Sequence, residues 1–224
     1  MEIAPTMYGD WESLFSGAAK IDIVPAAIQS CFFNTKHNLY SGPDEWVQHL
    51  NMVADLSRSL GCFYLVVGSP GARFAPAHML GVPGELSAAD RVLANVLAKA
   101  ADSNKDIFFG LEANPVKYGA NTATDAASAI RIAEFADRSN ICFHIDTGCL
   151  RVAGDDPVQV LSDGAAIIKR GHVSMPDLLP YDGSEREFIR KALQLGIGLS
   201  YEARPSATGE DGAARFLQDV EAAL

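Results

Sequence analysis

Four short apolar segments of the sequence each end in a side chain that can bind a metal ion. These side chains are Glu112, Asp146, His172 and Glu202. Each segment has the length and apolar character of a buried strand, and parallel neighbouring strands would bring their ends together. Three carboxylates and one imidazole suit Mn²⁺, Mg²⁺ or Co²⁺ and also accept Zn²⁺, with positions left for substrate or water. The sequence therefore predicts a divalent metal site.

Two further polar side chains are expected beside these ligands. Strand side chains alternate between faces, so Asn114 shares a face with Glu112, and His144 shares a face with Asp146. Pro115 ends the first of these strands. We expect Asn114 to line a substrate site. His144 is expected either to line that site or to be a hydrogen-bonded histidine of the core.

The elements that must position these groups alternate regularly along the chain. Buried-strand patterns cover residues 1–8, 24–33, 62–68, 107–113, 141–146, 171–175 and 197–203. Helical patterns cover residues 11–19, 43–60, 88–103, 124–138, 157–169, 184–195 and 209–224. Such alternation favours a parallel α/β sheet, either a closed barrel or an open doubly wound sheet.

The predicted ligands decide between these two architectures. In a TIM (β/α) barrel, residues at the carboxyl ends of successive strands all point into one mouth, whereas in an open sheet they diverge along a line. We therefore predict a barrel. No linker or shift in composition interrupts the chain, so residues 1–224 are expected to form one domain.

Composition limits the partners of the protein. The chain carries 18 basic and 28 acidic residues, a formal net charge of −10, which disfavours nucleic acid and anionic membranes. No apolar run approaches the roughly 20 residues that span a bilayer. The four cysteines have no CxxC spacing, so free thiols are expected. These features predict a soluble, cytoplasmic protein.

The order and spacing of several motifs resemble the xylose isomerase-like family of sugar phosphate isomerases and epimerases, which includes tagatose 3-epimerase-like enzymes. The resemblance runs over essentially the whole chain. It is carried by Glu2-Ile3-Ala4-Pro5-Thr6, Gln29-Ser30, Gly68-Ser69, Leu111-Glu112-Ala113-Asn114-Pro115, His144-Ile145-Asp146-Thr147-Gly148, Gly171-His172-Val173-Ser174 and Tyr201-Glu202.

The resemblance implies a function in carbohydrate metabolism. In the family pattern Glu112, Asp146, His172 and Glu202 bind the metal, and the two glutamates also transfer the proton. The implied reaction is isomerisation or epimerisation of a sugar or sugar derivative through a metal-stabilised enediolate. Two alternatives remain open. One is a lyase or dehydratase of a polyol or keto-cyclitol on the same scaffold, and the other is an inactive, truncated barrel with a binding role.

The substrate, a small sugar, is expected to contact five side chains: Gln29, Asn114, His144, Cys149 and Arg204. Many of these epimerases have a substrate-binding histidine three residues after the aspartate ligand, where this chain has Cys149. An arginine that usually follows the histidine ligand is also replaced. The substrate is therefore expected to differ from a simple free ketohexose.

The first strand and helix of the family pattern have no counterpart before Glu2. The sequence therefore predicts a barrel that lacks its first strand–helix unit, with unpaired edges at residues 1–5 and 197–203. Unpaired strand edges invite association. We expect a homodimer that covers them.

Overall fold

The computed structural model describes residues 2–3, 24–33, 35–82, 84–204 and 209–224. The helix predicted at residues 11–19 lies outside the described residues, as does most of the strand predicted at residues 1–8. The remaining predicted elements fall within the described ranges and can be compared with the structure.

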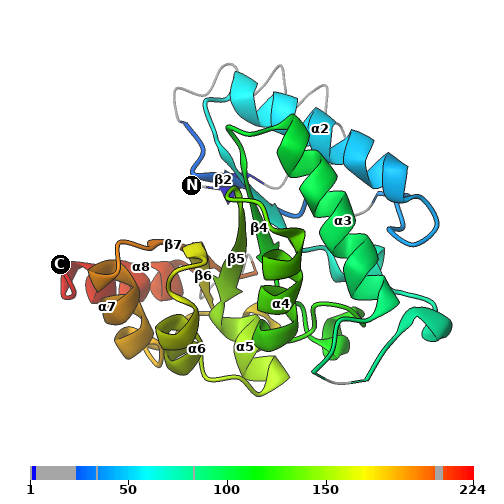
Figure 1. Ribbon diagram of the computed structural model, residues 1–224. Coiled ribbons are helices and arrows are strands. Elements are labelled where there is room, and N and C mark those ends of the chain that lie inside the picture. The colour runs from blue at the N-terminus through cyan, green and yellow to red at the C-terminus, as the bar shows by residue number, and fades with distance from the viewer. Residues whose placement is uncertain (1, 4–23, 34, 83, 205–208) are drawn as a thin grey trace.

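Seven strands form one sheet in which neighbours follow the order of the chain. Every neighbouring pair is parallel. The strands are β1 (Glu2–Ile3), β2 (Ala27–Ile28), β3 (Tyr64–Val67), β4 (Phe108–Glu112), β5 (Ile141–Asp146), β6 (Ile168–Ser174) and β7 (Gly198–Glu202). The sheet curls and carries its helices on the outside (Figure 1). The predicted α/β barrel architecture is confirmed.

The connections between strands carry the helices. These are α2 (Pro43–Ser59), α3 (Ala88–Ser103), α4 (Ala126–Ala136), α5 (Thr147–Ala153), α6 (Pro157–Gly164), α7 (Arg186–Gln194) and α8 (Gly209–Glu221). Short 3₁₀ turns occupy Pro70–Arg73, Ala77–Met79, Val116–Tyr118 and Pro176–Leu178. Among the described residues, no helix is both long enough and apolar enough to cross a membrane.

Local sequence explains where two of these helices begin. Ser87 accepts a hydrogen bond from the backbone N–H of Asp90, whose carboxylate accepts one from the N–H of Ser87. Asp125 and Ser128 form the same reciprocal arrangement at the start of α4. Each pair satisfies backbone donors that a helix leaves free in its first turn. These caps fix the residues at which α3 and α4 begin.

The core lies between the strands and these helices. All residues of β3 and β5 are buried, as expected for parallel strands that are covered on both faces. Phe109 and Phe143 on the neighbouring strands β4 and β5 are fully buried, and α3 contributes Leu93 and Leu97 to the same cluster. This packing holds the ends of β4 and β5 in fixed positions.

Two of the predicted elements are too long, and one helix of the structure was not predicted. The strand predicted at 24–33 has only Ala27 and Ile28 in the sheet, because Ser30 adopts a left-handed φ of 55° and begins a turn. The helix predicted at 157–169 ends at Gly164, because Ile168 pairs with Phe143 and starts β6 there. The helix α5 was not predicted. Ile167 and Ile168 fit the period of a helix as well as that of a strand, so the sequence alone does not show where the helix ends. The pairing of Ile168 with Phe143 on β5 places it in a strand.

The described residues form seven strands, whereas a complete TIM barrel has eight. Within the described residues, no backbone pairing joins β1 to β7. A side-chain hydrogen bond of 2.7 Å from Oγ of Ser200 on β7 to Oε1 of Glu2 on β1 crosses this seam instead. The unpaired edges expected from the sequence are therefore present, and the expected homodimer stays a prediction.

Candidate active site

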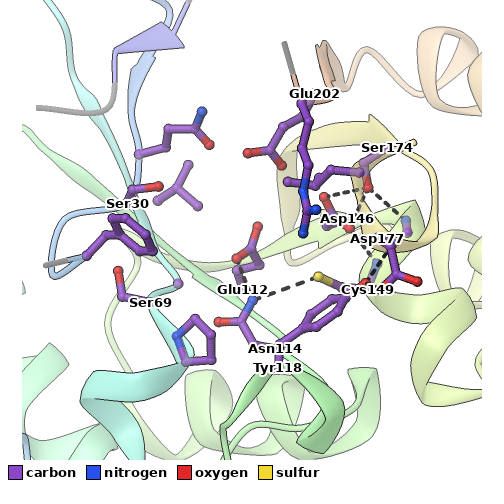
Figure 2. Close-up of a pocket in the computed structure, with 18 of the residues that line it drawn as sticks. Ser30, Ser69, Glu112, Asn114, Tyr118, Asp146, Cys149, Ser174, Asp177 and Glu202 are labelled. Carbon is purple, nitrogen blue, oxygen red and sulfur yellow. Dashed lines mark hydrogen bonds between the residues drawn. The ribbon is translucent and has the colours of Figure 1, made fainter. Parts of the chain in front are cut away.

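Four strands deliver the predicted metal ligands to one end of the sheet. Glu112, Asp146 and Glu202 are the last residues of β4, β5 and β7, and His172 lies opposite Asp146 in β6. Parallel strands end at the same edge, so these side chains share one mouth. Figure 2 shows the three carboxylates pointing toward a common space from their separate strands.

The imidazole of His172 lies at the centre of this group. Its Nδ1 atom is 3.3 Å from Oε2 of Glu202, 3.5 Å from Oε1 of Glu112 and 3.7 Å from Oδ2 of Asp146. The side chain of His172 is 1% exposed, and Nδ1 has no hydrogen-bond partner among the residues that the structure describes. A buried nitrogen without a partner is costly, unless it binds something that the four side chains enclose.

Hydrogen bonds hold Asp146 in place. Oγ of Ser174 lies 2.8 Å and 3.0 Å from its two carboxylate oxygens, and the backbone N–H of Cys149 donates to Oδ1 at 2.6 Å. The second contact makes Asp146 the N-cap of α5. The residue that ends the strand therefore also starts the next helix, which fixes the carboxylate from two sides.

Space for Glu112 comes from a glycine on the neighbouring strand. A Cβ atom at Gly68, directly after β3, would overlap Oε2 of Glu112. The same oxygen accepts a hydrogen bond of 2.7 Å from the side-chain amide of Asn114. The absence of a side chain at residue 68 thus allows Glu112 to turn toward His172.

The charges in the site are unbalanced. Burial raises the pKa of Glu112, and the carboxylates of Asp146 and Glu202 raise it further. Burial alone would lower the pKa of His172, but Glu2 and Glu202 raise it well above its ordinary value. One imidazolium cannot neutralise four neighbouring carboxylates. A divalent cation bound in place of that proton would satisfy Nδ1 and offset the negative charge, so these residues fit such an ion.

His144 lies on β5, next to His172 on the neighbouring strand β6. Its side chain is buried, its Nδ1 is 3.2 Å from the hydroxyl of Tyr64, and its ring packs edge-on against His172. Burial and the neighbouring imidazole lower the pKa of His144 to about 3, so the ring is neutral. This placement favours the core alternative over the substrate-binding one.

The mouth encloses a cavity of about 260 Å³. The predicted substrate-binding residues Gln29, Asn114, Cys149 and Arg204 line it, together with Glu112, Asp146, Glu202 and several apolar side chains. At its rim, Lys117 and Asp177 form an ion pair of 2.7 Å. Burial raises the pKa of Cys149, which keeps its thiol neutral and makes it part of the wall rather than a nucleophile.

Three solved structures show which known proteins share this architecture. An AP endonuclease of family 2 from Brucella melitensis superposes with a TM-score of 0.75 at 13% identity, over 97% of this chain and 86% of its own. A D-tagatose 3-epimerase-like protein superposes with a TM-score of 0.75 at 16% sequence identity, over 99% of this chain and 88% of its own. An L-ribulose 3-epimerase superposes with a TM-score of 0.71 at 19% sequence identity, over 96% of this chain and 80% of its own.

The chain shares the barrel fold of these three proteins. The predicted resemblance is therefore confirmed for the fold, which is all that identities of this size establish. No protein-family model and no curated protein sequence matches the chain.

Two residues outside the predicted ligand and substrate-binding sets contact these groups. Glu2 places Oε2 at 2.6 Å from Nε2 of His172. Arg73, which is fully buried, donates to the side-chain oxygen of Asn114 and to the backbone carbonyl of Glu112. Both contacts join distant parts of the chain, so spacing in the sequence carries no signal for them.

Proposed function

We propose that this protein is a divalent-metal-dependent isomerase or epimerase of a sugar or sugar derivative. The observation that carries the proposal is the buried Nδ1 atom of His172. In the described part of the chain this atom has no hydrogen-bond partner, and it lies 3.3–3.7 Å from carboxylate oxygens of three other strands. The three carboxylates, Glu112, Asp146 and Glu202, line a cavity that is large enough for a small molecule.

The metal would be held by Glu112, Asp146, His172 and Glu202. When bound, a divalent cation polarises a substrate carbonyl and offsets the negative charge that develops on its oxygen as a proton leaves the adjacent carbon. Mn²⁺, Mg²⁺, Co²⁺ and Zn²⁺ all suit the donor set. The IOLI protein, whose structure holds a zinc atom, shares this fold with a TM-score of 0.62 at 15% identity, which supports a divalent ion.

The two glutamates are suited to move the proton. Glu112 and Glu202 come from β4 and β7, which two other strands separate in the sheet, and both point into the same space (Figure 2). A substrate between them would be reached from two sides. One glutamate removes the proton, and the other returns it to the opposite face in an epimerase or to the adjacent carbon in an isomerase.

The remaining lining favours a small polyhydroxylated substrate. Polar residues line the cavity, namely Gln29, Ser30, Ser69, Asn114 and Tyr118. Such groups exchange hydrogen bonds with hydroxyls. The net charge of −10 disfavours DNA, the substrate implied by the name of the structurally similar endonuclease.

Deuterium exchange tests the proposal. The protein, loaded with Mn²⁺, is incubated in D₂O with a panel of ketoses and keto-polyols, and proton NMR records exchange next to the carbonyl and any new isomer. Exchange that a chelator stops and that Glu202→Gln abolishes would support the proposal. Loss of water to a conjugated carbonyl would indicate the dehydratase alternative. No exchange with any member of the panel would contradict an enolising enzyme.

A further inference from the structure

Glu2 joins the two open ends of the sheet. It lies on β1, at one end, and its carboxylate contacts His172 on β6 and Ser200 on β7, at the other. The contacts are 2.6 Å from Oε2 to Nε2 of His172 and 2.7 Å from Oε1 to Oγ of Ser200. The side chain of Glu2 is only 5% exposed. Both oxygens of this buried carboxylate are therefore used.

This contact determines which ring nitrogen of His172 is free. An ionised carboxylate only accepts hydrogen bonds, so Nε2 of His172 must carry the proton that it donates to Glu2. In the neutral ring the lone pair then resides on Nδ1. That atom is the one that faces Glu112, Asp146 and Glu202. Glu2 thus orients the ring and leaves the correct nitrogen available as a ligand.

We propose that Glu2 is a positioning residue of the metal site, which holds His172 in its ligating form and couples metal binding to the docking of β1. The inference rests on the metal site of the proposed function. Carboxylates that accept from a metal-ligating histidine typically contribute 10- to 100-fold to metal affinity. Glu2 makes this contact across the seam of an incomplete barrel, from the strand that lies farthest from His172 along the sheet.

The coupling to β1 follows from how few contacts hold that strand. In the described residues β1 pairs with β2 through two positions, Glu2 with Ala27 and Ile3 with Ile28. A second cavity, of about 400 Å³, opens at the seam and is lined by Glu2, Gln29, His172 and Ser200 among others. If docking of Glu2 strengthens metal binding by some factor, bound metal must favour the docked position of β1 by the same factor. This follows because the coupling between two equilibria is reciprocal.

Calorimetric titration with Mn²⁺ tests the first part. Glu2→Ala should weaken Mn²⁺ binding about 10- to 100-fold, because His172 loses its partner. Glu2→Gln should lie between Glu2→Ala and the unaltered protein, since its amide oxygen still accepts from Nε2. The matched control is Glu185→Gln. Glu185 is equally buried and is paired with Arg151 away from the ligands, so this variant should bind Mn²⁺ within about twofold of the unaltered protein.

Hydrogen exchange tests the second part. Bound Mn²⁺ should slow amide exchange in the peptide covering residues 24–33 of the unaltered protein, and should slow it less in Glu2→Gln. If Glu2→Ala does not fold, the Mn²⁺ affinity of Glu2→Gln decides the test. If Glu2→Gln and every folded Glu2 variant bind Mn²⁺ as tightly as the unaltered protein, the positioning role is wrong while the proposed function stands. If the unaltered protein binds no Mn²⁺, both fail.

Discussion

The side-chain amide of Asn114 donates a hydrogen bond of 2.7 Å to Oε2 of Glu112. Arg73 determines the direction of this bond, because its guanidinium donates to the amide oxygen of Asn114 and so turns the NH₂ group toward Glu112. Arg73 is fully buried and has no carboxylate in direct contact among the described residues. The position of Glu112 is thus set by a buried cation acting through one amide.

Removal of this amide should slow the reaction. We expect Asn114→Ala to lower kcat about 10- to 100-fold, since a misplaced proton-transfer group loses its alignment with the substrate. The matched control is Asn140→Ala, because Asn140 is also buried but donates to three backbone carbonyls outside the mouth. It should lower stability and leave the rate per folded molecule unchanged. A normal kcat in Asn114→Ala would show that Glu112 needs no such support.

Substitution of either glutamate, Glu112 or Glu202, should lower kcat much more than it changes KM. Glu112→Gln and Glu202→Gln keep the size of the side chain but cannot accept the proton, so each should lower kcat about 10²- to 10⁴-fold. KM should change much less. Steady-state kinetics with saturating Mn²⁺ separates the two constants. Turnover that survives both substitutions would rule out the two-base mechanism.

Gly68 should control the position of Glu112 through space alone. In Gly68→Ala the added methyl group would occupy the position of Oε2, so Glu112 must turn away and Mn²⁺ should bind about tenfold more weakly. Gly71→Ala is a fair comparison, because a Cβ there meets nothing within 4 Å. Calorimetry on the two variants should give a weakened and an unchanged affinity, and equal affinities would mean that the carboxylate adapts without loss.

The Glu2–His172 pair should make the metal-free protein sensitive to acid. Burial alone would raise the pKa of Glu2, but the charge and hydrogen bond of His172 lower it from 4.5 to about 2. A carboxyl group with a depressed pKa stabilises the folded state above its unfolded value of 4.5, and this contribution is lost as the pH falls toward 2. The difference, 4.5 − 2 = 2.5 pKa units, corresponds to about 3 kcal/mol.

Denaturant unfolding at several pH values checks this. The glutamine of Glu2→Gln does not titrate, so the stability advantage of the unaltered protein over the variant should shrink between about pH 5 and pH 3. A difference that stays constant over this range would mean that Glu2 does not change its pKa on folding.

The sequence could place the four predicted ligands because each lies at or near the carboxyl end of a predicted strand. Glu112, Asp146, His172 and Glu202 need only parallel, adjacent strands to meet, and the alternation of strands and helices already predicted such a sheet. Their roles stay a prediction until metal binding is measured. The geometry nevertheless agrees with the convergence that was expected from the strand ends alone.

The partners of these ligands could not be predicted in the same way. Glu2 is 170 positions from His172, and Arg73 is 41 positions from Asn114, so each contact depends on how the sheet curls. The helix α5 was missed for a local reason. The sequence after Asp146 predicts a ligand or a turn there, whereas the aspartate in fact serves as the N-cap of this helix.

The most direct test of the account is the metal content and Mn²⁺ affinity of the purified protein beside Asp146→Asn, by elemental analysis and calorimetry. Asp146 is buried and its carboxylate faces Nδ1 of His172, so its loss should remove a ligand without enlarging the site. The account predicts about one divalent ion per chain and an affinity at least tenfold weaker in the variant. Absence of measurable binding to the unaltered protein, or equal binding by both, would contradict a metal site built by these four strands.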